Sequence, residues 1–331
     1  MDPLSQAVVG AIVPMNVSTK AKLRLAALCG MVGGLVPDLD IYIKSETDPL
    51  LYLEYHRHFT HALLSIPFLG VFFGAFLWVL LSREKYLLKS YILFTTLGVA
   101  THGLLDTCTS YGTYLLWPFS DERLTWNNMP IIDPLFTLPL LMLILFSVFY
   151  KSRKIIHISL LYGFIYLGFS AFNMLTVKDI VYEKAVERGH HIERLFVNPT
   201  IGNIILWRSI YEFEGVYYVD AVHSVPFLQS FFIEGDSVKR IDPHTIYPEL
   251  GKDTQQRKDI LRFNHFAMGY VYELSPYKLS DLRYGALPQS VGAWWGIELN
   301  SENTDKHVKF FNPPRDLESF YQLKNMIFKY Q

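Results

Sequence analysis

A histidine and an aspartate stand one helical turn apart in an otherwise apolar stretch of the chain. The stretch reads ATHGLLD over residues 100–106, so His102 and Asp106 are related as i and i+4. Side chains at this spacing leave the same face of a helix. Ionisable groups at membrane depth are costly, and they therefore mark candidate functional sites. The pair could bind a metal ion, form a structural ion pair or relay protons.

Three further clusters of acidic or imidazole side chains lie nearby in the sequence. They read PDLD at residues 37–40, HRHFTH at residues 56–61 and IDP at residues 132–134. Carboxylate oxygens and imidazole nitrogens are the ligands that zinc, manganese and iron bind. An ion would also neutralise carboxylates that are expensive at this depth, and bound zinc lowers the pKa of its water from about 15.7 to about 7. The sequence predicts a divalent metal ion, most readily zinc, as the cofactor. Its predicted ligands are Asp40, His56, His61, His102 and Asp106.

Neighbouring residues could assist such a site. Arg57 is related to His61 as i and i+4 and could hold an anionic oxygen with two parallel hydrogen bonds. Thr60 and Thr101 each precede a histidine and could orient it through a hydrogen bond.

Structural roles remain open for several of these polar residues. Asp133 precedes a proline, as a helix cap often does, and Asp38 and Asp40 follow a proline and could belong to a helix-end turn. His58 could simply be solvated. His157, in an apolar stretch beside a basic loop, is expected to hydrogen-bond to a neighbouring helix.

The composition indicates a chain that is partly in a membrane and partly soluble. It has 331 residues, of which 50% are hydrophobic and only 18% are charged. This is too apolar for one ordinary soluble enzyme and too polar for membrane spans alone. The formal net charge of -1 gives no electrostatic case for nucleic-acid binding. Two cysteines, Cys29 and Cys108, cannot form a disulfide framework.

Apolar segments fill the first half of the chain. Four long ones cover residues 62–81, 91–105, 131–150 and 155–177, and two shorter ones cover residues 4–17 and 23–36. The long ones are near the roughly 17–25 residues of a spanning helix. Gly30, Gly33 and Gly34 would permit close helix contacts in a bundle.

The character of the sequence changes after Val177. Strands are expected at residues 215–222, 268–274 and 292–299, and helices at residues 254–266 and 314–330. The predicted fold is therefore a membrane α-helical bundle of four long and two short apolar helices, followed by a small α+β domain. The expected domains are residues 1–177, which carry the metal site, and residues 178–331.

Three basic loops predict the orientation of the bundle. Their residues are Lys20, Lys22 and Arg24; Arg83, Lys85 and Lys89; and Lys151, Arg153 and Lys154. Placing all three loops in the cytoplasm gives an alternating path for the helices. All four polar clusters then lie at the outer face of the membrane, together with the C-terminal domain.

The motifs together resemble those of the YdjM-like family of bacterial inner-membrane proteins. The similar stretches are MDPLSQ at residues 1–6, PDLD, HRxxTH, HxxxD, SYGTYLLWPFS at residues 110–120 and DLRYG at residues 281–285. Members of this family are regarded as metal-dependent hydrolases. The family is in turn distantly similar to zinc-dependent phospholipases C and fungal single-strand nucleases.

The resemblance implies roles for individual residues. His61, His102 and Asp106 would be metal ligands, and Asp38 or Asp40 would be a bridging ligand or base. Many family members have Thr-His where this chain has SQ at residues 5–6, so one imidazole is missing. The resemblance therefore implies one or two ions rather than three.

The function expected from the sequence is that of a multi-pass inner-membrane hydrolase with a metal-activated water. The bond that it cleaves would be a phosphoester, for example in a lipid head group, because the site would lie near the bilayer surface. Asp38 and Arg57 are the expected catalytic residues. The alternative is a non-enzymatic membrane scaffold or regulator in which the His/Asp clusters are structural. A transporter agrees less well with the sequence, because the ionisable residues lie at one side of the bundle and form no path across it.

Overall fold

Contacts divide the chain into two units, each built from segments that are not contiguous in the sequence. The computed structural model describes residues 1–82, 84–314 and 317–328, so Arg83 of the second basic loop and the end of the predicted C-terminal helix lie outside the described residues. Unit 1 comprises Met1–Tyr42, Tyr55–Phe172 and Ile201–Ile204, and unit 2 comprises Ile43–Glu54, Asn173–Thr200 and Ile205–Gln331. The domain boundary at residue 177 stays a prediction.

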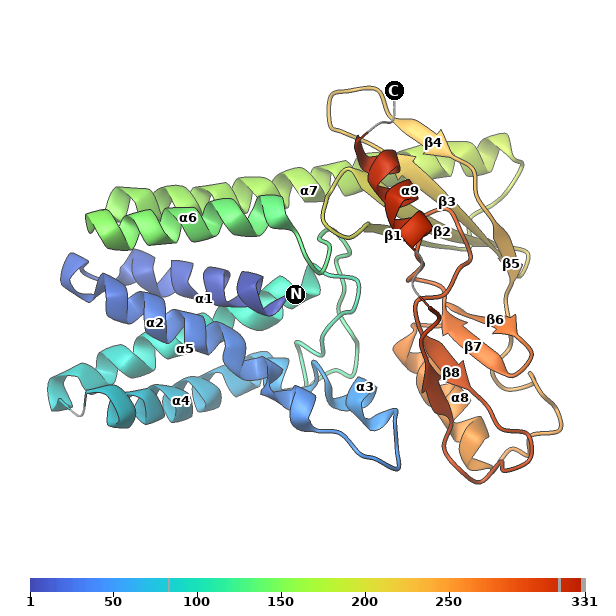
Figure 1. Ribbon diagram of the computed structural model, residues 1–331, viewed down its shortest axis with the longest axis horizontal. Helices are drawn as coiled ribbons and strands as arrows, with labels where there is room; N and C mark the ends of the chain where they lie inside the picture. Colours follow the sequence, from blue (N-terminus) through green and yellow to red (C-terminus); the bar gives the residue numbers. More distant parts are fainter. Residues whose placement is uncertain (83, 315–316, 329–331) are drawn as a thin grey trace. The chain divides into compact units, whose positions relative to one another are not determined.

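Unit 1 is a bundle of antiparallel helices (Figure 1). Its helices are α1 (Pro3–Val17), α2 (Leu23–Leu35), α4 (Ile66–Leu81), α5 (Leu88–Thr107), α6 (Pro134–Tyr150) and the first part of α7 (Arg153–Glu187). Short 3-10 turns join them: η1 (Lys20–Lys22), η2 (Val36–Tyr42), η3 (Phe59–His61), η4 (Leu63–Ser65) and η5 (Lys85–Leu87). The short helix α3 (Leu51–Tyr55) lies at the boundary of the two units.

The predicted number of long apolar helices is wrong. Within the described residues, three helical segments are long and apolar enough to cross a membrane: Lys20–Tyr42, Leu63–Leu81 and Arg153–Glu187. Two shorter apolar helices, α1 and α6, accompany them. The chain is thus a helical region with three long apolar segments followed by a β-sheet region, and not a bundle of four long and two short helices.

Local chemistry explains the difference. Turns η1 and η2 extend the segment around α2 at both ends, so a predicted short helix becomes a long one. The segment expected from Ile131 begins as a helix only at Pro134, because the Asp133 side chain caps it by accepting hydrogen bonds from two backbone N–H groups. Helix α5 has 20 residues, but threonine, histidine and aspartate side chains lower its hydropathy.

Glycines allow α1, α2 and α5 to pack with their backbones in contact. A Cβ atom at Gly98 of α5 would collide with the carbonyl oxygen of Gly30 in α2, and one at Gly30 would collide with that of Gly10 in α1. Close approach of this kind needs small residues at the contact. The predicted role of the α2 glycines is confirmed.

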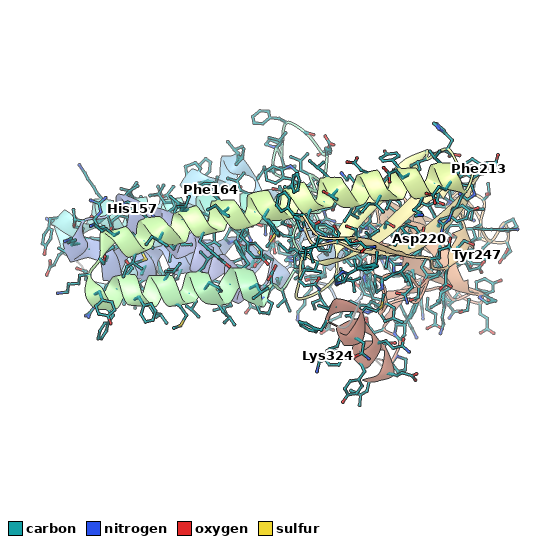
Figure 2. The ribbon with its side chains drawn as sticks, turned by 90° about the horizontal axis from the view of Figure 1, so that it is seen from above. His157, Phe164, Phe213, Asp220, Tyr247 and Lys324 are labelled. Atoms are coloured by element: carbon teal, nitrogen blue, oxygen red, sulfur yellow. The ribbon has the colours of Figure 1, made fainter. Side chains whose placement is uncertain are left out.

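The two ends of the bundle differ in chemistry. Helices α1, α4 and α6 all run away from the polar clusters, and α2, α5 and α7 return, so the three basic loops lie together at the left end of the bundle in Figure 1. Contacts between loops agree with this, since Lys22 Nζ donates to Ser90 Oγ at 2.8 Å and Arg153 donates to the Asn16 carbonyl at 3.1 Å. His157 of α7, labelled in Figure 2, also contacts Asn16, with Nδ1 2.6 Å from Oδ1, as its expected interhelical hydrogen bond requires.

Unit 2 contains two antiparallel sheets, the helices α8 and α9, the last part of α7 and most of α3. The first sheet holds β1 (Arg194–Pro199), β2 (Leu206–Phe213), β3 (Val216–His223) and β4 (Phe231–Ile233) in that order, and β5 (Ser237–Lys239) also pairs with β3. The second sheet holds β6 (Val271–Ser275), β7 (Lys278–Asp281), β8 (Gly296–Glu298) and β9 (Lys309–Phe311). Helix α8 (Gln255–Phe266) precedes the second sheet and α9 (Leu317–Phe328) follows it. Side chains from both sheets share one buried core that includes Ile210, Val219 and Tyr272.

The sequence predicts three of these strands and both helices, and it misses β1, β2, β4, β5, β7 and β9. Strand β3 and helix α8 lie within one residue of their expected bounds, β6 begins three residues later than expected, and Thr254 caps α8. The strand expected at residues 292–299 is too long, because only β8 forms there. The carbonyl of Gly292 lies so close to Gly285 that a Cβ atom at Gly285 would be 2.8 Å from it, so this stretch packs as a loop.

A segment of unit 2 interrupts the N-terminal half of the chain. We call Ile43–Glu54 the excursion, because residues on both sides of it belong to unit 1. Arg262 of α8 holds the excursion through Asp48 at 2.8 Å and Glu54 at 2.5 Å, and it also pairs with Asp259 of its own helix at 2.9 Å. The excursion therefore joins η2 to the HRHFTH stretch while being tied to the C-terminal part of the sequence.

Candidate metal centre

Four elements of unit 1 bring the predicted ligands to one end of the bundle. Turn η2 continues α2 and carries Asp38 and Asp40, and the turn after α3 carries His56. Turn η3 ends at His61. Helix α5 supplies His102 and Asp106 from successive turns of its last half, so the predicted i, i+4 pair lies on one helix. Three of the four polar clusters, all but the one that contains Asp133, thus meet in space.

The first group of ligand atoms comes from Asp38, His61, His102 and Asp106, all within 4.8 Å of one another. His61 Nε2 lies 2.9 Å from His102 Nε2 and 3.3 Å from Asp106 Oδ2. Asp38 Oδ1 lies 3.4 Å from each imidazole nitrogen, and His102 Nε2 lies 3.6 Å from Asp106 Oδ2. Ligand atoms bound tetrahedrally at 2.0–2.1 Å are separated by roughly 3.3 Å. The observed spacing of the ligand atoms therefore fits an ion with tetrahedral coordination.

Hydrogen bonds set the tautomers of both histidines so that their free nitrogens face each other. His102 Nδ1 lies 2.6 Å from the carbonyl oxygen of Gly34, which can only accept, so His102 donates from Nδ1. His61 Nδ1 lies 3.1 Å from Asp40 Oδ2, a carboxylate acceptor. In the neutral rings both Nε2 atoms then carry lone pairs directed into the same space. A positive charge between them, a proton or a metal ion, is what makes this arrangement favourable.

A second group shares a carboxylate with the first. It consists of Asp38, Asp40 and His56. Asp40 is the centre of a hydrogen-bond network: its Oδ1 lies 2.8 Å from His56 Nδ1, and its Oδ2 accepts from Thr60 Oγ1 at 2.7 Å and from the backbone N–H of Arg57 at 2.9 Å. Since Asp38 belongs to both groups, it is placed as a bridging carboxylate would be in a two-ion site.

Asp106 is held by partners that sequence reasoning missed. Gln6 Nε2 of α1 donates to Asp106 Oδ1 at 2.8 Å, and the α-amino group of Met1 also contacts this oxygen. Within the described residues, Gln6 Oε1 is a buried acceptor without a hydrogen-bond partner, which is an acceptor that a cation could satisfy. The sequence analysis set Gln6 apart only through the family resemblance, which implies a histidine at this position in many members.

Arg57 reaches the site in a different way from the one that its sequence spacing suggests. It is not on a helix with His61, because α3 ends at Tyr55 and Arg57 adopts a left-handed backbone conformation with φ 66°. Its Nε lies 3.0 Å from Asp106 Oδ2, and its guanidinium donates to Thr109 Oγ1 at 2.8 Å. Only 5% of Arg57 is exposed. The guanidinium therefore pairs with the carboxylate of a candidate ligand.

Burial controls access to the cluster and the protonation of His61. The side chains of His61, His102 and Asp106 are fully buried, whereas Asp38 is 21% and His56 is 12% exposed. Burial alone would lower the pKa of His61, but hydrogen bonds to Asp106, Asp38 and Asp40 raise it to about 10. A metal ion bound through His61 would have to replace its proton, so metal binding and proton release would be linked.

Glycine at position 103 lets η3 lie against α5. A Cβ atom on Gly103 would stand 2.5 Å from the carbonyl oxygen of His61. The residue next to His102 therefore has to lack a side chain if the two imidazoles are to meet.

Other polar residues singled out in the sequence lie outside both groups. Asp133 caps α6 and accepts from the Tyr166 hydroxyl at 2.7 Å, as the capping alternative requires. His58 packs among aromatic rings, with Tyr114 at a centroid distance of 4.8 Å. The expected support of His102 by Thr101 is wrong, because the Thr101 hydroxyl donates to the carbonyl of its own helix, a common satisfaction for threonine in helices.

Comparisons with known proteins address the same region. A family model described as YdjM inner membrane protein matches residues 1–177, which include all residues of both ligand groups. The uncharacterized protein YfhP of Bacillus subtilis (strain 168) is 24% identical over 279 residues, which cover 82% of this chain and 81% of that protein. No solved structure matches significantly. The chain belongs to the YdjM inner membrane protein family.

Proposed function

We propose that this protein is a metal-dependent hydrolase of the inner membrane that cleaves a phosphoester with an activated water. The observation that carries the proposal is the spacing of Asp38, His61, His102 and Asp106, whose ligand atoms are 2.9–3.6 Å apart in the five pairs measured. Donors from three separate elements meet at this spacing in a buried site, where uncompensated carboxylates would be expensive.

A bound divalent ion, most consistently zinc, would supply Lewis acidity and lower the pKa of a water from about 15.7 to about 7. The protein residues divide the remaining tasks. Asp38 is the most exposed carboxylate of the first group and would accept the proton of the attacking water. Thr60 and Asp40 hold the His61 ring in its ligand tautomer. Arg57 fixes Asp106 and adds positive charge where a phosphoester oxygen becomes more negative.

Chelation tests this proposal directly. Detergent-purified protein is expected to hydrolyse bis(p-nitrophenyl) phosphate, to lose that activity in a chelator and to regain it with added Zn²⁺ or Mn²⁺. Asp133→Asn is the matched control, because Asp133 is a buried carboxylate outside both ligand groups and asparagine also caps helices. Hydrolysis that persists in chelator, or no hydrolysis with any of these ions, would contradict the proposal and favour the scaffold alternative.

We also propose that the metal centre and unit 2 face the outer side of the inner membrane. The basic loops lie at the end of the bundle away from the cluster, and basic loops favour the cytoplasm. A cysteine at exposed Ser301 is expected to react with a membrane-impermeant maleimide in intact spheroplasts, whereas one at exposed Lys154 should react only after lysis. Both native cysteines are buried, so background labelling should be low. The reverse labelling pattern would refute this orientation.

A further inference from the structure

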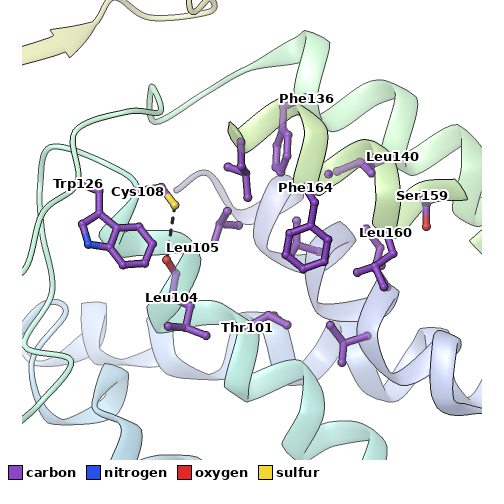
Figure 3. Close-up of a pocket in the computed structure, with 15 residues that line it drawn as sticks. Thr101, Leu104, Leu105, Cys108, Trp126, Phe136, Leu140, Ser159, Leu160 and Phe164 are labelled. Atoms are coloured by element: carbon purple, nitrogen blue, oxygen red, sulfur yellow. Dashed lines mark hydrogen bonds between the residues drawn. The ribbon is translucent and has the colours of Figure 1, made fainter. Parts of the chain in front are cut away.

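An apolar cavity of about 330 Å³ lies in unit 1, on a different face of α5 from the candidate metal ligands His102 and Asp106. Side chains of α1, α5, α6 and α7 line it, together with Trp126 from the loop before α6 (Figure 3). Its size falls at the lower end of the range for ligand pockets, roughly 300–1,000 Å³.

The lining offers an occupant almost nothing to hydrogen-bond. Each of its hydroxyl and thiol groups donates to a carbonyl of its own helix: Thr101 to Gly98, Cys108 to Leu104 and Ser159 to Ile156. The other lining side chains are aliphatic, aromatic or glycine, and among them only the indole of Trp126, at the rim, has a hydrogen-bond donor. Apolar cavities exclude water and accept apolar ligands. The occupant must therefore be hydrocarbon.

Helix α5 presents the cavity and the metal centre on adjacent faces. Thr101, Leu104, Leu105 and Cys108 line the cavity, whereas His102 and Asp106 carry the ligand atoms. Residues that follow each other in a helix are about 100° apart around its axis. A molecule in the cavity is consequently separated from the metal centre by a single helix.

The cavity starts at the depth of the metal centre and extends into the bundle. Along α5 it reaches from the C-cap residue Cys108 back to Thr101, and on α7 from Leu167 back to Ser159. These spans of seven and eight residue steps correspond to about 10–12 Å along the helix axes. Both directions lead toward the end of the bundle that carries the basic loops.

The cavity has a buried floor and an exposed rim. Leu105, Phe136 and Leu140 are buried, whereas Trp126 and Phe164 of the rim are 53% and 67% exposed. An exposed apolar rim on a membrane helix such as α7 faces lipid, so a chain can enter from the side.

We propose that this cavity binds one acyl chain of a phospholipid whose head group lies at the metal centre. An amphiphile fits both features: its chain runs along α5 and α7 into the bundle, and its phosphate stays at the end where Asp38 is exposed. The role of the head group rests on the proposed hydrolase function. The binding of an acyl chain rests only on the size and apolar lining of the cavity.

Two glycines of α7 provide a matched test. A Cβ atom at either Gly163 or Gly168 would meet nothing within 4 Å, so both positions have room for a larger side chain. Gly163 lines the cavity and Gly168 does not. Gly163→Phe should therefore fill the cavity, whereas Gly168→Phe adds the same side chain outside it. Gly163→Leu is a smaller substitute if the phenylalanine variant fails to fold.

Native mass spectrometry with palmitoyl-oleoyl phosphatidylglycerol as the probe would measure the binding. Wild type and Gly168→Phe are expected to retain one lipid, and Gly163→Phe to bind it at least about tenfold more weakly, because the ring takes the space of several methylene groups. Equal retention by all three proteins, or equal weakening by both phenylalanine variants, overturns the proposal.

Hydrolysis of the soluble bis(p-nitrophenyl) phosphate separates this proposal from the proposed function. Gly163→Phe should leave that rate unchanged and slow only the cleavage of the phospholipid. If wild type binds the lipid in a Gly163-dependent manner but hydrolyses neither compound, the proposed function fails and the acyl-chain site stands. If it hydrolyses the soluble ester while Gly163→Phe retains lipid as wild type does, the acyl-chain site fails alone.

Discussion

Replacing His102 and Asp106 together by alanine is expected to remove the bound metal. The two residues supply two of the four atoms in the first ligand group. Four-ligand zinc sites have apparent binding free energies of about 10–16 kcal/mol, so the loss of two ligands should weaken binding by about a thousandfold or more. Metal analysis of purified protein, dialysed against limiting Zn²⁺, would measure the change.

Two further variants make this result interpretable. Asp106→Asn keeps the side-chain volume and a carbonyl oxygen, so it should weaken the site without leaving a cavity in α5. Asp133→Asn removes a buried charge outside the site and should retain wild-type metal content. Equal metal content in the double variant and in wild type would show that these side chains do not bind the ion.

Asp38→Ala is expected to affect the site more than His56→Ala does. Asp38 belongs to both ligand groups, whereas His56 belongs only to the second. Asp38→Ala should therefore lower metal content at both positions and reduce hydrolysis by at least about a hundredfold, since even partners of the ligands typically contribute 10–100-fold. His56→Ala should release one ion and leave the other bound.

Stoichiometry is the measurement that distinguishes the two variants. Metal content per chain should fall from two to one in His56→Ala and toward zero in Asp38→Ala. If wild type binds one ion and His56→Ala leaves it bound, the second group is a hydrogen-bond network around Asp40. If His56→Ala and Asp38→Ala lose the same amount of metal, the division into two groups is wrong.

The local features of the site are visible in the sequence. An i, i+4 spacing needs only a helix to bring His102 and Asp106 onto one face, and α5 provides it. Charge in short loops predicted which ends of the helices would meet, because the basic and acidic clusters alternate along the chain. Strand β3 was predictable for the same reason, since it depends on residues adjacent in sequence.

Features that depend on distant residues were not predictable in this way. Gln6 reaches Asp106 across 100 positions, and Asp48 reaches Arg262 across 214. Hydrophobic periodicity in the sequence does not indicate contacts between residues so far apart. The left-handed backbone of Arg57 is a further case, because arginine carries no preference for that conformation and the surrounding contacts impose it.

Salt should act on the segment that connects two of the site's ligands. Arg262, Asp48 and Glu54, which hold the excursion, are 22%, 21% and 44% exposed. Dissolved ions screen partly exposed charges, with a Debye length of about 10 Å at 0.1 M salt. The ion pairs that hold the chain between Asp40 and His56 should consequently weaken as ionic strength rises. The buried contacts among the candidate ligands in unit 1 are screened far less.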